Sequence, residues 1–524
     1  MAPTSIAFKV KGFESVLSKG CESFNIPIMR KRSEAWRHFD VDGILAEDFS
    51  SQPPKSLPAG FDLESVRESL EASRHLLPSE EVAARLVYID NVFVPSLSIQ
   101  EARSDDGSSF SCYNASPHSL PSHFQSHFTI LPDAVTDDLP YKPTTTRNVI
   151  PISTLSGEHH MVGPFNSQSA VNNQQGIGGF AALNSIKCED IAVVDVPEGA
   201  IVEKPIQIIR LVSPSGVNAA VHPRAMIICG DSSSARVVQS NVDLSEEVGP
   251  TTSTPGPTLV NSFTQALVGE KASLAHSFIE ESGGLFESFT EEDDDSLERE
   301  ANRPQLKNTN FENIHVHVNG QGGSYESTLI GASGNGRAKI CMCAHQMETE
   351  THVGVNGLAL AGGAQSLDMR TNIHHIAAGC TSAQAQRNVV GGRSTVTFKG
   401  RIRVEQSAQQ TDSDQLARSL LLNEKSRVWC MPSLEIIADD VKCTHGATIS
   451  DLSEEELFYL RSRGLSRELS RNLQLNAFVA AVSEQFDDAY LGDNKIGLRR
   501  RLKDKLMRIV PRGERQVLGE YSSV

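Results

Sequence analysis

The feature that most constrains the fold is a series of short runs between residues 149 and 437 in which apolar and polar residues alternate. Val396 and Phe398, for example, lie between polar neighbours. Alternation with a period of two is typical of strands with one buried face. Glycine pairs separate these runs, among them Gly362–Gly363 and Gly391–Gly392, and recur at intervals of roughly 28–29 residues. Such a series predicts a stacked β-solenoid, in which each coil covers the next, or else a sandwich.

The chain on either side of this series has a different pattern. Before it, a helical run at Phe61–Leu77 ends at Pro78, a hairpin is expected at Asp90–Asn91, and a Ser/Pro-rich connection follows. A chain of 524 residues is too long for one ordinary core. We therefore expect three domains, which are a mixed and helical N-terminal domain (1–148), a β core (149–437) with an acidic loop at 283–304, and a C-terminal helical domain (438–524).

Three helices are expected near the C-terminus. A capping box at Ser453 begins the first, and the second starts near Ser466. The stripe expected on the second helix contains Leu469, Leu473 and Ala477. The third covers 498–509, and its apolar face contains Leu498, Leu502, Leu506 and Ile509. The rest of this third helix is strongly basic, which indicates either an ordinary solvated face or pairing with an acidic surface.

Charge and cysteine content limit the compartment and the partners. The formal net charge is −17, which argues against nucleic acid or an anionic membrane as the main partner. Nine cysteines in no regular framework, without a secretory segment or a long apolar run, indicate a reducing, soluble compartment. Long insertions and Ser-rich connections favour the plastid stroma, with the bacterial cytoplasm as the alternative.

One region carries a specific resemblance. The run from Pro432 to Thr448, followed by the run from Leu457 to Gly464, resembles the C-terminal signature of the SufB/SufD family. Phe398–Val404 and Ala408–Asp412 resemble the core pattern of the same family. The Cys-Thr-His-Gly sequence at Cys443–Gly446 is similar to the SufD branch, because the SufB branch carries a His-Glu-Ala pattern there.

This resemblance implies a mainly β fold, a right-handed parallel β-helix flanked by an N-terminal domain and a C-terminal helical domain. It implies a non-catalytic scaffold that pairs through the β-helix with a SufB paralogue and binds the ATPase SufC through the C-terminal helices. A transient iron–sulfur cluster would be shared with SufB, and reduced flavin is linked to such complexes. No segment resembles a P-loop, so ATP is expected on SufC and not on this chain.

Cys443 and His445 are the candidate metal ligands. They are two residues apart, so on an extended strand both side chains point to one face. Thiolate and imidazole both suit iron, but two ligands do not hold a cluster alone, and a partner would supply the others. The resemblance favours His445 as the ligand from this subunit. The alternative is a buried cysteine beside a hydrogen-bonded histidine.

A second group of cysteines and histidines lies further upstream. Its members are Cys341, Cys343, His345, His352, His374 and His375. Stacked coils would bring some of them together, but their spacing is not diagnostic of a metal site. We expect them to fill rungs of the solenoid.

Two other functions remain open. A β-helix enzyme acting on polysaccharide would need suitably placed carboxylates and, usually, a secretory signal. A SufB-like subunit would itself carry the principal cluster cysteine, which the Cys443–Gly446 sequence disfavours.

Overall fold

The computed structural model describes most of the chain between residues 61 and 510. The described ranges are 61–103, 109–116, 188–212, 220–244, 258–282, 308–334, 336–492 and 496–510, with a few isolated positions and two short strands, β5 (Thr129–Ile130) and β6 (Asn148–Val149). The expected acidic loop at 283–304 lies outside the described residues.

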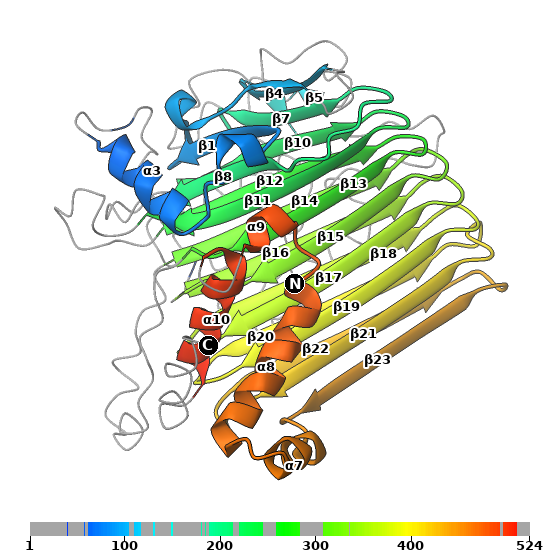
Figure 1. Ribbon diagram of the computed structural model, residues 1–524. Helices are drawn as coiled ribbons and strands as arrows, with labels where there is room; N and C mark the ends of the chain where they lie inside the picture. The colour runs from blue at the N-terminus through cyan, green and yellow to red at the C-terminus, as the bar shows by residue number, and fades with distance from the viewer. Residues whose placement is uncertain are drawn as a thin grey trace, which may run out of the picture.

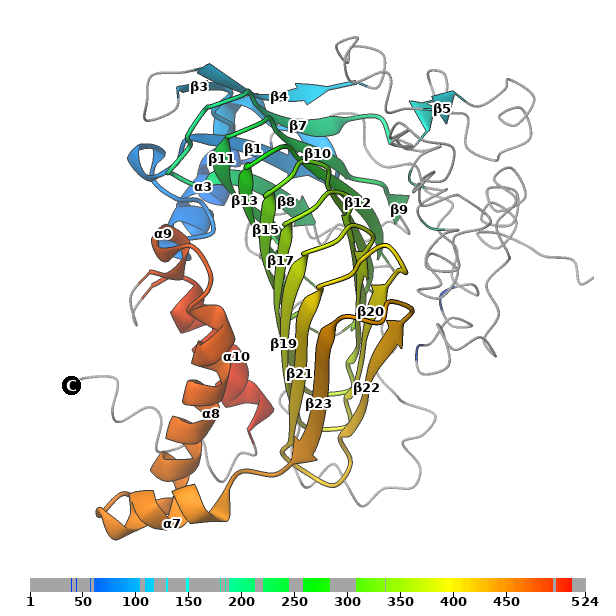
Figure 2. The ribbon, with the colours of Figure 1, turned by 90° about the vertical axis from the view of Figure 1, so that its right-hand side faces the viewer.

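Two facing sheets form the core, and successive strands of the chain alternate between them (Figures 1 and 2). Sheet 1 contains β2 (Val92–Phe93), β1 (Ala84–Ile89), β8 (Ile206–Val212), β11 (Ser234–Asp243), β13 (Ser273–Glu280), β15 (Ser324–Gly331), β17 (His352–Ala361), β19 (Thr381–Val390), β21 (Asp412–Leu421) and β23 (Lys442–Ser450), in that order. Sheet 2 contains β22 (Arg427–Ile436), β20 (Thr395–Val404), β18 (Ser366–His375), β16 (Gly336–Gln346), β14 (Asn308–Val318), β12 (Thr258–Val268), β10 (Arg224–Cys229), β7 (Ile191–Val196), β4 (Ser109–Ala115) and β3 (Glu101–Arg103), with β9 (Ala220–Val221) beside β12.

The pairing within both sheets is parallel from β8 to β23, and from β10 onward each strand pairs with the strand two places later in the chain. The fold is therefore mainly β, with paired parallel sheets in a β-helix-like arrangement. This confirms the stacked coils that the alternation predicts. A sandwich of antiparallel hairpins would instead join neighbouring strands within one sheet.

The coils are in register along their corners. The length of a coil is shown by contacts between neighbouring coils. Lys339 and Asp368, which form an ion pair, are 29 residues apart, and Ser382 and Ser413, which share a hydrogen bond, are 31 residues apart. At one corner of each coil lies a residue with positive φ. These residues are Gly199, Ser232, Lys271, Gly322, Glu350, Gly379 and Gln410. Each of these residues donates its backbone N–H to a carbonyl of the next coil, so the corner is a continuous ladder of hydrogen bonds.

The glycine pairs mark a different corner. Gly392 has φ +65°, and a Cβ there would lie 2.8 Å from the backbone of Gly363 on the preceding coil. A Cβ on Gly391 would lie 2.7 Å from Cγ2 of Ile509. The repeated glycines therefore allow close stacking of coils and close approach of the last helix.

Apolar side chains fill two layers. The first lies between the sheets and includes Val316, Ile340 and Val353. The second lies between the outer face of sheet 1 and the C-terminal helices, which are α7 (Glu454–Ser462), α8 (Arg467–Ser483), α9 (Asp488–Leu491) and α10 (Leu498–Ile509) (Figure 2). None of the helices in the described part of the chain is long and apolar enough to cross a membrane.

The helix predictions are confirmed with two differences. The expected helix at Phe61–Leu77 is α3 (Leu63–Ala72), which ends early because Arg74 adopts φ 57°. In α8 the buried apolar residues are Leu475, Val479 and Val482, whereas Leu473 is 44% exposed. The helix α8 carries two apolar stripes, and the stripe that packs against sheet 1 is not the one expected from the sequence. The hairpin turn at Asp90–Asn91, where both residues have positive φ, is as expected.

The basic residues of α10 pair partly with the protein's own acidic groups. The guanidinium of Arg501 donates to Glu281 over 3.1 Å, and Nε2 of His75 lies 3.0 Å from the same carboxylate. Arg499 donates to Glu484 over 2.9 Å. The buried contact joins α10, the end of β13 and the segment after α3, so it fixes the last helix on sheet 1.

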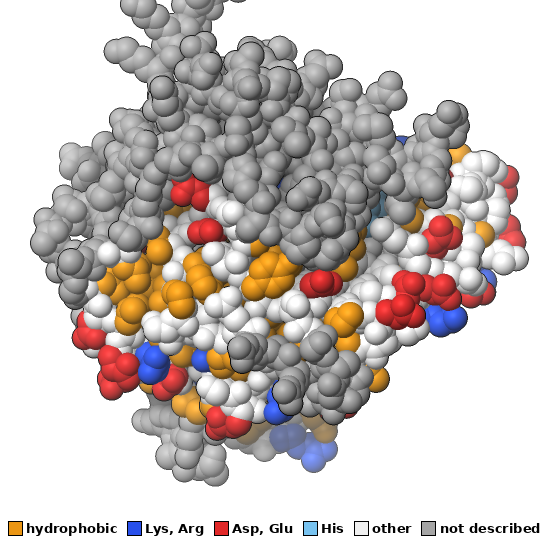
Figure 3. Space-filling model, turned by 90° about the horizontal axis from the view of Figure 1, so that it is seen from above, with side chains coloured by type: hydrophobic (Ala, Val, Ile, Leu, Met, Phe, Trp, Pro, Cys, Tyr) orange, Lys and Arg blue, Asp and Glu red, His pale blue; other side chains and the backbone are white. Residues whose placement is uncertain are grey.

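Strands from both ends of the sequence belong to the sheets. β1 pairs with β8 and β4 pairs with β7, while β23 pairs with β21 beyond residue 437. Seen from the end of the stack at which β4 lies, hydrophobic side chains form a band on the described surface, and acidic side chains lie on both sides of it (Figure 3). The opposite end of the stack is formed by β22 and β23 (Figure 2).

Candidate functional site

The last coil holds both predicted ligands. In β21 the inward-facing residues are buried, and the register pairs Ser413 with Cys443 and Gln415 with His445. Cys443 and His445 therefore continue the inward-facing row and share one face, as their spacing predicts. No further described strand covers β23, so the row is open to solvent at His445.

The two side chains have different surroundings. Cys443 is half-buried and packs against the core between the sheets. Burial raises the pKa of its thiol, and the nearby Asp412 carboxylate adds to the effect. His445 is exposed in the middle of β23. A neutral thiol beside an exposed imidazole makes His445 the more available of the two donors.

The interior becomes polar as it approaches this end. Ser382 and Ser413 lie 2.8 Å apart, and the amide of Gln415 donates to Gln384 over 2.5 Å. Oε1 of Gln415 is buried and has no hydrogen-bond partner among the described residues. This acceptor is on the residue paired with His445, where it is suited to fix a ring tautomer.

The free edges of the last two strands differ. The N–H of Lys442 donates to Thr411, so the backbone groups of Cys443, His445 and the alternate residues after them point to the free edge of β23. The N–H of Ile437 donates to Val404, so Pro432 lies in the edge-facing row of β22. Since proline has no N–H, the edge of β22 lacks one donor while that of β23 is continuous.

Apolar side chains are exposed on and beside these edges. Trp429, Ile436, Ile437 and Ile449 are between 42% and 49% exposed. A second exposed apolar group lies on the C-terminal helices, where Phe458 is 74% and Tyr459 is 58% exposed. Each group is a candidate docking surface.

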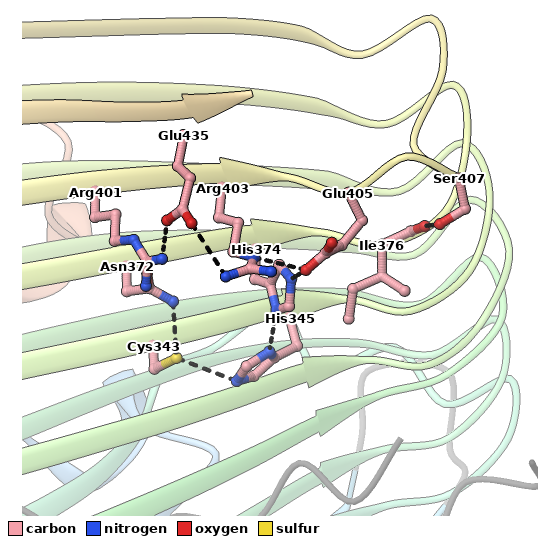
Figure 4. A network of polar contacts seen from close by, with 10 residues as sticks. All are labelled: Cys343, His345, Asn372, His374, Ile376, Arg401, Arg403, Glu405, Ser407 and Glu435. Carbon is pink, nitrogen blue, oxygen red and sulfur yellow. Dashed lines mark hydrogen bonds and ion pairs between the residues drawn. The ribbon is translucent and has the colours of Figure 1, made fainter. Parts of the chain in front are cut away.

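The upstream cysteines and histidines are only partly brought together. Cys343, His345 and His374 meet on the outer face of sheet 2 (Figure 4). Cys341 lies near the buried pair of Lys339 and Asp368 instead. The other two histidines are elsewhere, since His352 binds Glu326 on sheet 1 and His375 binds Ser382.

Five further polar residues of this group were not anticipated. They are Asn372, Arg401, Arg403, Glu405 and Glu435 (Figure 4). The signal that could have found most of them is the coil length, since the 29-residue step that joins His345 to His374 also joins Cys343 to Asn372. Within the described ranges, no three His, Cys, Asp or Glu side chains converge in a way that could hold a metal ion.

Comparison with known proteins identifies the family. Residues 212–478 match the family model described as "SUF system FeS cluster assembly, SufBD core domain". The chain is 28% identical over 324 residues to "Protein ABCI7, chloroplastic" of Arabidopsis thaliana, which covers 60% of this chain and 61% of that protein. It is 25% identical over 470 residues to the SufBD family protein slr0076 of Synechocystis, covering 89% and 86% of the two chains.

A third relative carries a more specific name. The chain is 34% identical over 161 residues to the iron–sulfur cluster assembly protein SufD of Escherichia coli, covering 31% of this chain and 36% of that protein. The matches to the Arabidopsis and E. coli proteins thus span less than two thirds of those relatives. The family model spans half of the chain, and its match contains the predicted core and signature segments. The chain therefore belongs to the SufBD family of iron–sulfur cluster assembly proteins.

Proposed function

We propose that this chain is a SufD-type scaffold subunit, without catalytic activity of its own, which helps to build and transfer nascent iron–sulfur clusters. Its partners would be a SufB-like paralogue and the ATPase SufC. The observation that carries the proposal is the open last coil, where exposed His445 and half-buried Cys443 share one face at a free strand edge. The SufD name of the E. coli relative supports the SufD type.

The paralogue would dock on the last coil. The uninterrupted row of edge-facing groups on β23 offers main-chain hydrogen bonds, and exposed Ile449 and Trp429 offer apolar contact. A nascent cluster at this junction would take His445 and, secondarily, Cys443 from this chain and its remaining ligands from the paralogue. The Cys-Thr-His-Gly sequence at Cys443–Gly446 disfavours the alternative of a SufB-like subunit whose own cysteine is the principal ligand. A polysaccharide-active enzyme has no support from the family.

SufC would dock on α7 and α8, where Phe458, Tyr459 and Leu473 are exposed beside a face that already packs on sheet 1. ATP would bind to SufC, and its hydrolysis would move α7 and α8 relative to the last coil. Reduced flavin would be held by the assembled complex. The chloroplastic relative supports a plastid stroma location, and the E. coli relative supports the alternative of a bacterial cytoplasm.

We also infer that the coils wind in the right-handed sense, because parallel strands joined by crossovers almost always do so. Three domains remain our proposal, divided near residues 148 and 437. The pairing of β23 with β21 supports moving the second boundary to about residue 451.

The ligand assignment is tested on the reconstituted complex. His445→Ala should leave the complex assembled, since an exposed imidazole contributes little packing, but should lower the iron, sulfide and visible absorption of the loaded complex several-fold. Cys443→Ser should have a smaller effect. His352→Ala, which removes a partly exposed histidine from β17, is the matched control and should load normally. A normal cluster yield in the His445→Ala complex contradicts the assignment.

The docking surface for SufC is tested separately. A chain that ends after Asp451 keeps β23, whereas one that ends after Ile437 would also lose it. The chain ending after Asp451 and the Phe458→Asp variant should each retain the paralogue and lose SufC in pull-downs. Retention of SufC by both would place the contact elsewhere.

A further inference from the structure

The outer face of sheet 2 carries a second cysteine–histidine pair that the proposed function does not use. Cys343 and His345 lie on β16, and their side chains meet, with Sγ 3.1 Å from Nε2 (Figure 4). Both residues are buried, at 0% and 3% exposure. Two soft donors that face each other inside a protein are the first requirement of a site for a soft cation.

The histidine is held in one orientation by a chain of hydrogen bonds. Nδ1 of His345 lies 3.3 Å from Nδ1 of His374, and Nε2 of His374 lies 2.8 Å from the carboxylate of Glu405. A carboxylate accepts, so His374 donates from Nε2 and accepts at Nδ1, and His345 must donate from Nδ1. The lone pair of His345 is then on Nε2, the nitrogen that faces the sulfur.

This series of hydrogen bonds resembles the support of a metal-bound imidazole in known sites, where the second ring nitrogen donates toward a carboxylate. Here the carboxylate is reached through a second imidazole. In the tautomer that these hydrogen bonds select, Nε2 of His345 carries no proton and is able to bind a cation.

A third donor lies beside the sulfur. The amide nitrogen of Asn372 is 3.2 Å from Sγ of Cys343, and Oδ1 of the same amide is buried without a hydrogen-bond partner among the described residues. A turn of the amide about its last bond would direct this oxygen to the sulfur side. Because the third donor is an amide, this site differs from a group made only of His, Cys, Asp and Glu side chains.

Two guanidinium groups, those of Arg401 and Arg403, lie near the site, and each pairs with a carboxylate. Arg401 pairs with Glu435, and Arg403 lies 2.6 Å from Glu405 and 3.2 Å from Glu435. The two guanidinium groups are thus balanced by two carboxylates at the margin of the site.

We propose that Sγ of Cys343, Nε2 of His345 and the amide oxygen of Asn372 form a site for a soft divalent cation of the Zn²⁺ type, with His374 and Glu405 as positioning residues. At Zn–S and Zn–N bond lengths of about 2.3 and 2.0 Å, the sulfur and nitrogen ligands of one tetrahedral ion lie about 3.5 Å apart, so the observed separation of 3.1 Å has to open by about 0.4 Å on binding. On binding, the S–H bond is replaced by a metal–sulfur bond and the proton passes to the buffer. A water molecule completes the coordination.

The probe is Co²⁺ alone, added to the full chain after treatment with a chelator, because a cobalt–thiolate bond gives a charge-transfer absorption. We expect one equivalent with this absorption. Cys343→Ser and His345→Gln should weaken binding at least 100-fold, and Glu405→Gln should weaken it about 10–100-fold. Cys341→Ser, on the same strand and face, is the matched control and should bind as the unmodified chain does.

Two further variants keep the outcome decisive. Asn372→Asp should bind more tightly, a gain that misfolding does not produce. The double variant Cys443→Ser/His445→Ala should retain the absorption, which separates this site from the one on the last coil. The proposal is overturned if the absorption persists in Cys343→Ser, if it disappears in the double variant, or if no variant of the three donors changes the affinity.

Discussion

The two Cys-x-His pairs of this chain have the same spacing and different surroundings. Cys343 and His345 lie in the middle of sheet 2, on its outer face, and are buried. Cys443 and His445 lie on the last strand of sheet 1, in the inward-facing row, where one is half-buried and the other exposed. The difference arises from position in the stack, because His345 has strands on both sides and His445 has a described strand on one side only.

This comparison shows how a repeating fold assigns different chemistry to one motif. In the middle of the stack the next coil supplies His374 and Asn372, so the pair is enclosed by side chains of the same protein. At the end of the stack the missing neighbour is an open position. A pair there is suited to a site that a second protein completes, whereas the enclosed pair is suited to an ion held by this chain alone.

The largest expected difference between the two pairs is in stability. His345→Ala removes a buried ring and its hydrogen bonds to Cys343 and His374, so it should lower the free energy of unfolding by about 2–4 kcal/mol. His445→Ala removes an exposed side chain and should change it by less than about 0.5 kcal/mol. Chemical denaturation of both variants under the same conditions measures this. Equal losses would show that the last coil is as well packed as the middle.

The second expected effect is the response to acid. Burial lowers the pKa values of His276, His315 and His375 to about 3, and it lowers the pKa of His345 well below its ordinary value. Since the unfolded chain takes up protons below about pH 6.5 and these buried rings do not, stability is complete above that pH and is lost as the pH falls, by about 1.4 kcal/mol per pH unit for each ring.

The free energy of unfolding of His345→Gln should therefore fall less steeply between pH 6.5 and pH 5 than that of the unmodified chain. The difference in slope should equal the contribution of one imidazole ring. Cys343→Ser, which keeps all the histidines, should retain the original slope. Unfolding free energies measured at several pH values give the comparison. An unchanged slope in His345→Gln would mean that this ring takes up a proton in the folded protein.

The sequence pattern predicts stacked coils or a sandwich, and it predicts that Cys443 and His445 share one face, but it assigns them to the helical region after residue 437 and not to the last strand. Alternation identifies strands, and glycines at one coil length apart identify the stacking, because close corners require them. The match of Cys443 and His445 to one face follows from their spacing alone. The burial of each pair does not follow from the spacing, because a period of two predicts a shared face but not whether that face points inward or outward.

The features that sequence reasoning missed depend on contacts between distant segments. The chosen stripe of α8 is decided by the shape of sheet 1, where Leu475 and Val479 meet the residues of β17 and β19. Glu405 and Glu435 join the outer-face network because each lies one coil, 31 or 32 residues, after its partner, which is His374 or Arg403. Neither contact has a local signal in the chain.

The smallest expected effect tests whether the last coil opens independently. Glu350 and Gln410 occupy the left-handed corner position, which costs a residue with a side chain about 1 kcal/mol or more. Glu350→Gly should raise the free energy of unfolding by about 0.5 kcal/mol, less the loss of its bond from Gln321. The control is Gly379→Ala, where φ is +70° and the nearest atom to a new Cβ is 3.9 Å away, so strain alone should lower stability by about 1 kcal/mol.

Gln410 differs from Glu350 because its N–H donates to Asp440 of the last coil. In a stack of coils that contact only their neighbours, an end coil can open before the whole chain unfolds. Gln410→Gly should then slow hydrogen exchange in β22 and β23 while leaving global unfolding almost unchanged, whereas Glu350→Gly should shift global unfolding. Equal shifts from both substitutions would mean that β22 and β23 unfold only together with the middle coils, and the end pair would then be as rigidly held as the enclosed one.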